Sequence, residues 1–281
     1  MKKIAILPNS DKDTGLEKTK YVIECLSEKA ELYMLKVHEF NTESVCFVDE
    51  CDIYSMVDYA IVLGGDGTII QCATECAKNN IPVMGINMGT VGFLTEVEID
   101  DISEAVNKLL NDDFETEKRM MLCTEIIKDS KTVSVHHALN DVVISKTIDE
   151  KLINIGLYTN NELVNSYNAD GLIIATPTGS TGYSISAGGP VADPLMQLYI
   201  ATPICAHMLS ARSAILSAEK EIIIKIGNNR ADTDAVVTTD GDIRGYINSA
   251  DEIRISKSEF EFELIKTVKQ SFYETLLSKL I

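Results

Sequence analysis

A carboxylate flanked by glycines follows an apolar run in the first quarter of the chain. Residues 59–63 are apolar without interruption, and Gly64-Gly65-Asp66-Gly67-Thr68 comes directly after them. Glycine amides and the start of a helix can approach a phosphate group closely. The loop lacks a Walker lysine, and a carboxylate repels phosphate oxygens by about 1 kcal/mol at 4 Å in water. Asp66 is therefore expected to take a proton from an attacking hydroxyl or to bind a metal ion. The structural alternative is a tight strand–helix turn with Asp66 as a local cap.

A second run is rich in hydroxyl groups. Residues 176–186 carry seven hydroxyl side chains and no charged group, and they follow Asp170-Gly171 and an apolar stretch. Hydroxyls and glycine amides suit a neutral cradle for ribose, amide and phosphate oxygens. An ordinary loop of Ser, Thr and Gly is the alternative.

A third pair, Asn140-Asp141, stands at the head of another apolar run. These side chains could bind a ribose diol, and a hydrogen bond to a carboxylate contributes about 1.5–3 kcal/mol. A simple turn is the alternative. His136 and His137 precede the pair, but adjacent strand residues point to opposite faces, so we interpret both as structural rather than as metal ligands.

Strand and helix patterns alternate around the first motif. Apolar runs predict strands at 3–7, 59–63 and 81–86. Helical spacing predicts helices at 68–78 and 99–110, and an earlier one that includes Val22, Ile23, Leu26 and Ala30. Cys72 and Cys76 share one face of the middle helix and are expected in the core. This alternation predicts a doubly wound α/β domain over residues 1–119.

Short β-like runs dominate the rest of the chain. They lie at 121–127, 132–136, 138–144, 152–158, 172–175, 214–216, 221–226, 235–239 and 252–256. Turn residues separate many of them, which predicts a β-rich, mainly antiparallel domain over residues 120–264. Helical spacing returns at 268–281, and residues 265–281 are expected to rejoin the first domain.

Charge and composition narrow the function classes. The formal net charge of −18 repels nucleic acids and anionic membranes, and no apolar run approaches the roughly 18 residues of a membrane helix. Any bound phosphate must be held by backbone amides, a few local cations or a metal ion. The seven scattered cysteines suit a reducing compartment. We expect a soluble cytoplasmic protein that binds neither nucleic acid nor membrane.

Together these motifs resemble the NAD kinase family. The resemblance covers about residues 58 to 245 and rests on Gly64–Thr68, Asn140-Asp141 and the long run from Asp170 to Pro190. It also includes two shorter motifs: Pro203, His207, Leu209, Ser210 and Arg212, followed by Asp240-Gly241.

The resemblance implies transfer of the γ-phosphoryl group of ATP, or of polyphosphate, to the 2′-hydroxyl of the adenosine ribose of NAD. It also implies Mg²⁺ or another divalent ion, a homotetramer or dimer, and Asp66 as the general base. The nucleotide-binding residues that it implies are Gly65, Gly67, Thr68, Phe93, Asn140, Asp141, Lys151, Asn168, Asp170, Thr178, Thr181, Gly182, Tyr183, Ser184, Ile185, Ser186 and Asp242.

The chain departs from the commonest family pattern at four positions. Asp141 replaces a more frequent Glu, Gly182 a frequent Ala, Asn168 a frequent basic residue and Asp242 a frequent Gln. Lys151 is expected to supply one cation. Lipid and sugar kinases share the Gly-Gly-Asp-Gly-Thr loop and are the rival enzymes, although the net charge speaks against a lipid substrate. An NAD-binding sensor is the non-enzymatic rival.

Overall fold

The computed structural model describes residues 1–89, 92–148, 152–207, 211–227, 235–267 and 271–280. The chain forms two compact units, residues 1–118 with 261–281, and residues 119–260. Both transitions between the units fall inside long strands, β6 (Glu115–Lys128) and β17 (Glu252–Lys266). From the sequence, the boundaries are expected after residues 119 and 264.

The first unit alternates strands and helices. Its elements are β1 (Lys2–Pro8), α1 (Glu17–Leu26), β2 (Ala30–Leu35), β3 (Val45–Val48), α2 (Glu50–Met56), β4 (Tyr59–Gly64), α3 (Asp66–Lys78), β5 (Val83–Asn87), α4 (Ile102–Leu110) and α6 (Phe272–Leu280), with short 3-10 turns at Thr14–Leu16, Lys36–His38 and Ile99–Asp101.

The strands of this unit form a parallel sheet in the order β5-β4-β1-β2-β3, with the end of β17 beside β5. The central strands β4 and β5 are buried almost throughout, which explains their uninterrupted apolar sequence. Because β1 and β4 run parallel with Pro8 opposite Leu63, the segments that follow these two strands emerge at the same edge of the sheet.

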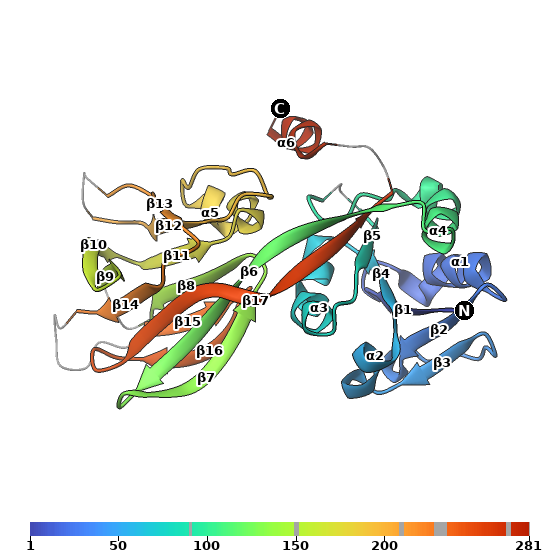
Figure 1. Ribbon diagram of the computed structural model, residues 1–281, viewed down its shortest axis with the longest axis horizontal. Helices are drawn as coiled ribbons and strands as arrows, with labels where there is room; N and C mark the ends of the chain where they lie inside the picture. Colours follow the sequence, from blue (N-terminus) through green and yellow to red (C-terminus); the bar gives the residue numbers. More distant parts are fainter. Residues whose placement is uncertain (90–91, 149–151, 208–210, 228–234, 268–270, 281) are drawn as a thin grey trace. The chain divides into compact units, whose positions relative to one another are not determined.

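Helices cover both faces of this sheet (Figure 1). Apolar residues of α1 and α4 pack together with Ile4, Ile61 and Met84 in one core cluster. On the opposite face, Gly85 leaves room for Ile69 of α3, since a Cβ there would lie 2.6 Å from the Ile69 side chain. The prediction of a doubly wound α/β domain is confirmed.

The second unit is built from strands. Its elements are the remainder of β6, β7 (Lys131–Ala138), β8 (Asp141–Lys146), β9 (Ile153–Thr159), β10 (Glu162–Ala169), β11 (Gly171–Ala175), a 3-10 turn (Thr178–Thr181), α5 (Tyr183–Ser186), β12 (Leu198–Ile204), β13 (Ala214–Ser217), β14 (Ile222–Ile226), β15 (Ala235–Thr239), β16 (Asp242–Ile247) and the first part of β17.

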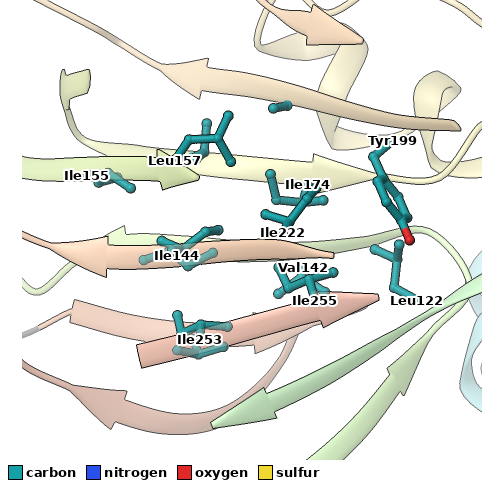
Figure 2. Packing of buried hydrophobic residues seen from close by; sticks show 14 of the residues in the cluster. Leu122, Val142, Ile144, Ile155, Leu157, Ile174, Tyr199, Ile222, Ile253 and Ile255 are labelled. Carbon is teal, nitrogen blue, oxygen red and sulfur yellow. The ribbon is translucent and has the colours of Figure 1, made fainter. Parts of the chain in front are cut away.

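Antiparallel pairing joins these strands into two layers. One sheet has the order β13-β12-β11-β8-β15-β16, and the other joins β10, β9, β14 and β17, with β6 beside β17 and β7 beside β6. Figure 2 shows Ile144 and Ile174 of the first layer together with Ile222, Ile253 and Ile255 of the second in a single core. The prediction of a β-rich, mainly antiparallel domain is confirmed.

Three local expectations differ from the structure. Ala30 begins β2 instead of extending the preceding helix, which ends at Leu26. The apolar run 138–144 is not one strand, because β7 ends at Ala138 and β8 begins at Asp141. Helix α3 begins at Asp66, two residues before the expected Thr68. In the expected C-terminal helix, residues 268–270 and 281 lie outside the described residues, and α6 covers 272–280.

Candidate active site

Asp66 lies where β4 ends and α3 begins, and its half-buried carboxylate binds backbone. Oδ2 accepts a hydrogen bond from the Phe93 N–H at 2.8 Å, and Oδ1 accepts one from the Leu94 N–H at 3.0 Å. Gly92 lets this segment approach, since a Cβ there would lie 1.8 Å from Oδ1. Asp66 therefore fixes the segment after β5, and its own position is fixed in return.

The glycine loop is braced by the segment that follows β1. The Asn9 N–H donates to the Leu63 carbonyl at 2.8 Å, and the Asn9 side-chain amide donates to Thr68 Oγ1 at 3.0 Å. Gly64 permits this contact, since a Cβ there would lie 2.3 Å from Thr68 Oγ1. Thr68 is a predicted nucleotide contact, and its Oγ1 accepts hydrogen bonds from the Asn9 side chain and, at 3.5 Å, from the Gly65 N–H. Gly67 is exposed, and a Cβ on it would have nothing within 4 Å.

Lys12 brings a cation to this loop, and the sequence did not single it out. A Cβ on Gly65 would lie 2.7 Å from Lys12 Nζ. Lys12 is exposed, and no carboxylate in the described part of the chain forms an ion pair with it. The signal that could have found it is its place four residues beyond β1, the strand that lies beside β4.

Phe93, one of the expected nucleotide-binding residues, packs within the first unit against α6. Its ring centroid lies 5.7 Å from that of Phe272, and Lys279 Nζ lies 4.5 Å from the Phe93 centroid. A cation over an aromatic face is favourable. Phe93 is half-buried, and its backbone N–H donates a hydrogen bond to the Asp66 carboxylate.

In the second unit, Asp240 holds the turn that contains Asn140 and Asp141. Its carboxylate accepts hydrogen bonds from the backbone N–H groups of Leu139 at 2.7 Å, Asn140 at 2.8 Å and Asp141 at 3.0 Å. The Asp240 N–H donates in return to the Asp141 carbonyl at 3.0 Å. The sequence pointed to Asp240-Gly241 only as part of a family motif, without a role.

Burial and the nearby Asp240 change the protonation of Asp141. Asp141 is only 6% exposed, and burial, followed by the nearby charge of Asp240, raises its pKa to about 7. Burial also raises the pKa of Asp240, while its three backbone donors oppose the shift. Near neutral pH Asp141 is therefore poised between its neutral and charged forms.

The hydroxyl-rich run closes on the same turn. Thr176 Oγ1 donates to the Leu139 carbonyl at 2.6 Å and accepts the Gly179 N–H at 3.0 Å. A Cβ on Gly179 would lie 2.1 Å from the Asn140 carbonyl oxygen, and one on Gly182 would lie 3.5 Å from Asn140 Nδ2. The structure thus brings Asn140, Asp141, Gly182 and the start of the hydroxyl run together.

Many hydroxyls of this run are satisfied inside the protein. Ser180 Oγ exchanges hydrogen bonds with the backbone of Ala192, and Ser184 Oγ lies 3.0 Å from Thr202 Oγ1. Thr181 Oγ1 donates to the Thr178 carbonyl at 3.2 Å, while Thr178 Oγ1 accepts from Arg119 at 3.4 Å. The remaining predicted residues of the run differ in exposure: Tyr183 and Ser186 are exposed, and Ile185 is half-buried.

The remaining predicted residues are not part of the turn formed by Leu139, Asn140 and Asp141. Asp170 forms an ion pair with Lys146 at 2.9 Å. Asn168 is exposed and accepts from the Asn154 side chain at 3.3 Å. Asp242 is exposed and forms an ion pair with Arg244 at 3.0 Å. Lys151, Leu209 and Ser210 lie outside the described residues.

The described residues contain no group of three or more His, Cys, Asp or Glu side chains arranged to hold a metal ion. His137 Nδ1 lies 3.0 Å from Ser258 Oγ, and its ring packs edge-on against Phe260. None of the described helices is long and apolar enough to cross a membrane.

The sequence matches two domains of one family. Residues 15–114 match the ATP-NAD kinase N-terminal domain, and residues 139–267 match the ATP-NAD kinase C-terminal domain. Over 289 residues the chain is 39% identical to the NAD kinase of Thermoanaerobacter sp. (strain X514), covering 100% of this chain and 99% of that protein. It is 37% identical to the NAD kinase of Lachnoclostridium phytofermentans, covering 99% of each.

Solved structures share the fold. A yeast NADH kinase complexed with NADH matches with a TM-score of 0.89 at 24% identity, covering 100% of this chain and 87% of that one. An NAD kinase from Archaeoglobus fulgidus in complex with ATP matches with a TM-score of 0.76 at 25% identity, covering 99% and 98%.

Proposed function

Because the chain belongs to the NAD kinase family, we propose that it transfers the γ-phosphoryl group of ATP to the 2′-hydroxyl of the adenosine ribose of NAD, giving NADP. Relatives of equal length that carry the name NAD kinase support this acceptor, and the related structure with bound ATP supports this donor. Polyphosphate is a second candidate donor.

Asp66 is the proposed general base, and the observation that carries this role is its fixed carboxylate. Each of its oxygens accepts one backbone N–H and keeps a further lone pair for a substrate proton. In phosphoryl transfer an attacking hydroxyl must lose its proton, and a positioned base typically contributes 10²–10⁴-fold in rate. Held in this way, Asp66 needs little reorganisation when the hydroxyl arrives.

The phosphates of ATP are proposed to lie at the glycine loop. In a chain of net charge −18, the ammonium of Lys12 beside Gly65 is a local attraction for an anion. Gly67 and Thr68 form the remainder of the loop that faces the phosphates. Mg²⁺ is proposed to enter as part of Mg–ATP, where it neutralises phosphate charge.

NAD is proposed to bind Asn140 and Asp141. Asn140 Oδ1 is buried and accepts no hydrogen bond from the described residues, so it offers an acceptor to a ligand donor such as a ribose hydroxyl. Asp141 supplies a second acceptor once it is ionised. Phe93, Lys151, Asn168, Asp170, Asp242 and the residues from Thr178 to Ser186 remain proposed dinucleotide contacts.

A homodimer or tetramer in the cytoplasm is also proposed. The seven cysteines are all free, which suits a reducing compartment. Strand β16 lies at the end of its sheet and exposes Ile243 and Tyr246, which are 62% and 57% exposed. Light scattering coupled to size-exclusion chromatography measures the subunit number directly.

The deciding experiment is NADP formation from NAD with ATP and then with polyphosphate, each with and without Mg²⁺. We expect NADP with Mg–ATP, and an Asp66→Asn enzyme that still binds NAD but turns over about 10²–10⁴-fold more slowly. Asp52→Asn, an exposed acid on α2, is the control. NAD binding without any NADP would indicate a sensor, and phosphorylation of a sugar or lipid instead of NAD would indicate the rival kinases.

A further inference from the structure

The segment between β7 and β8 depends on a carboxylate from a distant part of the chain. Leu139 and Asn140 lie between the two strands, and Asp141 is the first residue of β8. The backbone N–H groups of all three residues donate to one side chain, Asp240, about 100 residues later in the sequence. A carboxylate suits three converging N–H groups because both of its oxygens accept hydrogen bonds and, when ionised, neither donates one.

The position of Asp240 is itself well determined. Asp240 and Gly241 connect β15 to β16 with positive φ values of 50° and 90°, as in a two-residue hairpin turn that favours Asp-Gly. Strand β15 also pairs with β8, with Thr239 opposite Val142, so the hairpin tip meets the start of β8. The Asp240 N–H closes this contact on the Asp141 carbonyl.

The Asn140 backbone is confined from a second direction. Gly179 approaches the Asn140 carbonyl so closely that no side chain would fit, and the Thr176 N–H donates to that carbonyl at 2.9 Å. A shift of the turn would therefore move the two side chains that we propose bind NAD, and would also disturb the hydroxyl-rich run. The orientation of Asn140 and Asp141 is set by Asp240 on one side and by Gly179 on the other.

We propose that Asp240 is a positioning residue for NAD, which acts by holding the backbone of Leu139, Asn140 and Asp141 through its carboxylate. The inference rests on the proposed binding of NAD by Asn140 and Asp141. Asp240 need not contact the substrate. Its role is to keep the acceptors of this turn in the arrangement that a ribose diol can use.

The test compares Asp240→Asn with the wild-type enzyme in KM for NAD, KM for ATP and kcat at pH 8.5. Asparagine replaces one acceptor oxygen by an NH₂ donor that faces the backbone donors. Loss of a buried acceptor predicts a rise of about tenfold in KM for NAD. The KM for ATP should change less than about twofold, because the turn is not part of the proposed phosphate loop.

The kinetics are measured at pH 8.5 because, if Asp240 acted only through its charge, Asp240→Asn would lower the KM for NAD instead of raising it. Removing the charge of Asp240 lowers the pKa of Asp141 and leaves it more ionised, which would lower the KM for NAD near neutral pH. Above the pKa of Asp141 this effect is small, so a higher KM reports the geometry of the turn.

The matched control is Asp251→Asn. Asp251 is also buried, accepts the Asn248 N–H at 3.0 Å in another turn of the same unit, and lies outside the proposed site. We expect it to lower the melting temperature without changing either KM. An equal rise in KM for NAD in the control would overturn the proposal, because any weakened turn would then have the same effect.

Asp141→Asn separates this inference from the proposed function. If Asp141→Asn raises the KM for NAD and Asp240→Asn does not, the positioning role is wrong while the NAD site stands. If neither variant changes the KM for NAD, the proposed NAD contacts are wrong, and the positioning role of Asp240 is wrong as well. Should Asp240→Asn fail to fold, Gly241→Ala strains the same hairpin and keeps the carboxylate, and an unchanged KM for NAD in that variant would overturn the proposal.

Discussion

Asp141→Asn should remove a specific pH dependence from the stability of the protein. Burial and the charge of Asp240 raise the pKa of Asp141 from its ordinary 3.8 to about 7. Between these values the unfolded chain ionises at this position while the folded chain keeps the proton, so rising pH favours unfolding. The stabilising contribution is complete below about pH 4 and is lost as the pH rises through about 7.

The expected loss of unfolding free energy follows from the pH range between the pKa values of Asp141 in the unfolded and folded chains. A shift of one pKa unit corresponds to about 1.4 kcal/mol, so the two units between pH 5 and pH 7 correspond to about 3 kcal/mol of unfolding free energy. Burial raises the pKa of Asp240 as well, and the charge of Asp240 contributes to the shift at Asp141. Asparagine has no proton to lose and should abolish the contribution of Asp141.

Urea unfolding at pH 5 and at pH 8, followed by far-UV circular dichroism at constant ionic strength, measures this difference. The wild type should lose about 3 kcal/mol more unfolding free energy than Asp141→Asn between the two pH values. Asp52→Asn makes the same change in net charge at an exposed position and should follow the wild type. Equal pH dependence in the wild type and in Asp141→Asn would refute the reasoning.

Two further substitutions test the loops around the proposed site. Lys12→Ala should raise the KM for ATP about tenfold, as expected for a lost charge-assisted contact, while Lys29→Ala, an exposed lysine on the loop after α1, should not. An unchanged KM for ATP would remove Lys12 from phosphate binding. Gly179→Ala should lower the melting temperature and raise the KM for NAD, because its Cβ would overlap the Asn140 carbonyl. Wild-type values in steady-state kinetics and calorimetry would contradict the close approach.

Local pattern was enough to predict the central elements and the main motifs. Strands β4 and β11 are buried on both faces, so their apolar runs stand out in the sequence, and glycines or hydroxyl residues mark where each ends. Cys72 and Cys76 are buried on α3, as their four-residue spacing predicted. These features are local, and the physical rules that identify them need only neighbouring residues.

Other elements depend on partners that are distant in the sequence. Strand β10 carries Asn165, Ser166 and Asn168 among its eight residues and has a weak apolar pattern, yet pairing with β9 makes it a strand. Neighbouring residues likewise give no sign that Asp240 would meet Leu139, since that contact follows from the register of β15 on β8. Lys12 joins the glycine loop only because β1 lies beside β4.

The double attachment of Asp66 has a consequence for how kinetic data at this position are interpreted. One side chain is proposed to accept a proton and also ties down the backbone of Phe93 and Leu94. A slower Asp66→Ala enzyme would therefore report the loss of a base together with the release of a peptide segment, and the rate ratio would overstate the chemistry. Asparagine keeps one of the two hydrogen-bond acceptors and alanine keeps neither. The difference in rate between Asp66→Asn and Asp66→Ala therefore reports the part of the rate loss that comes from releasing the backbone.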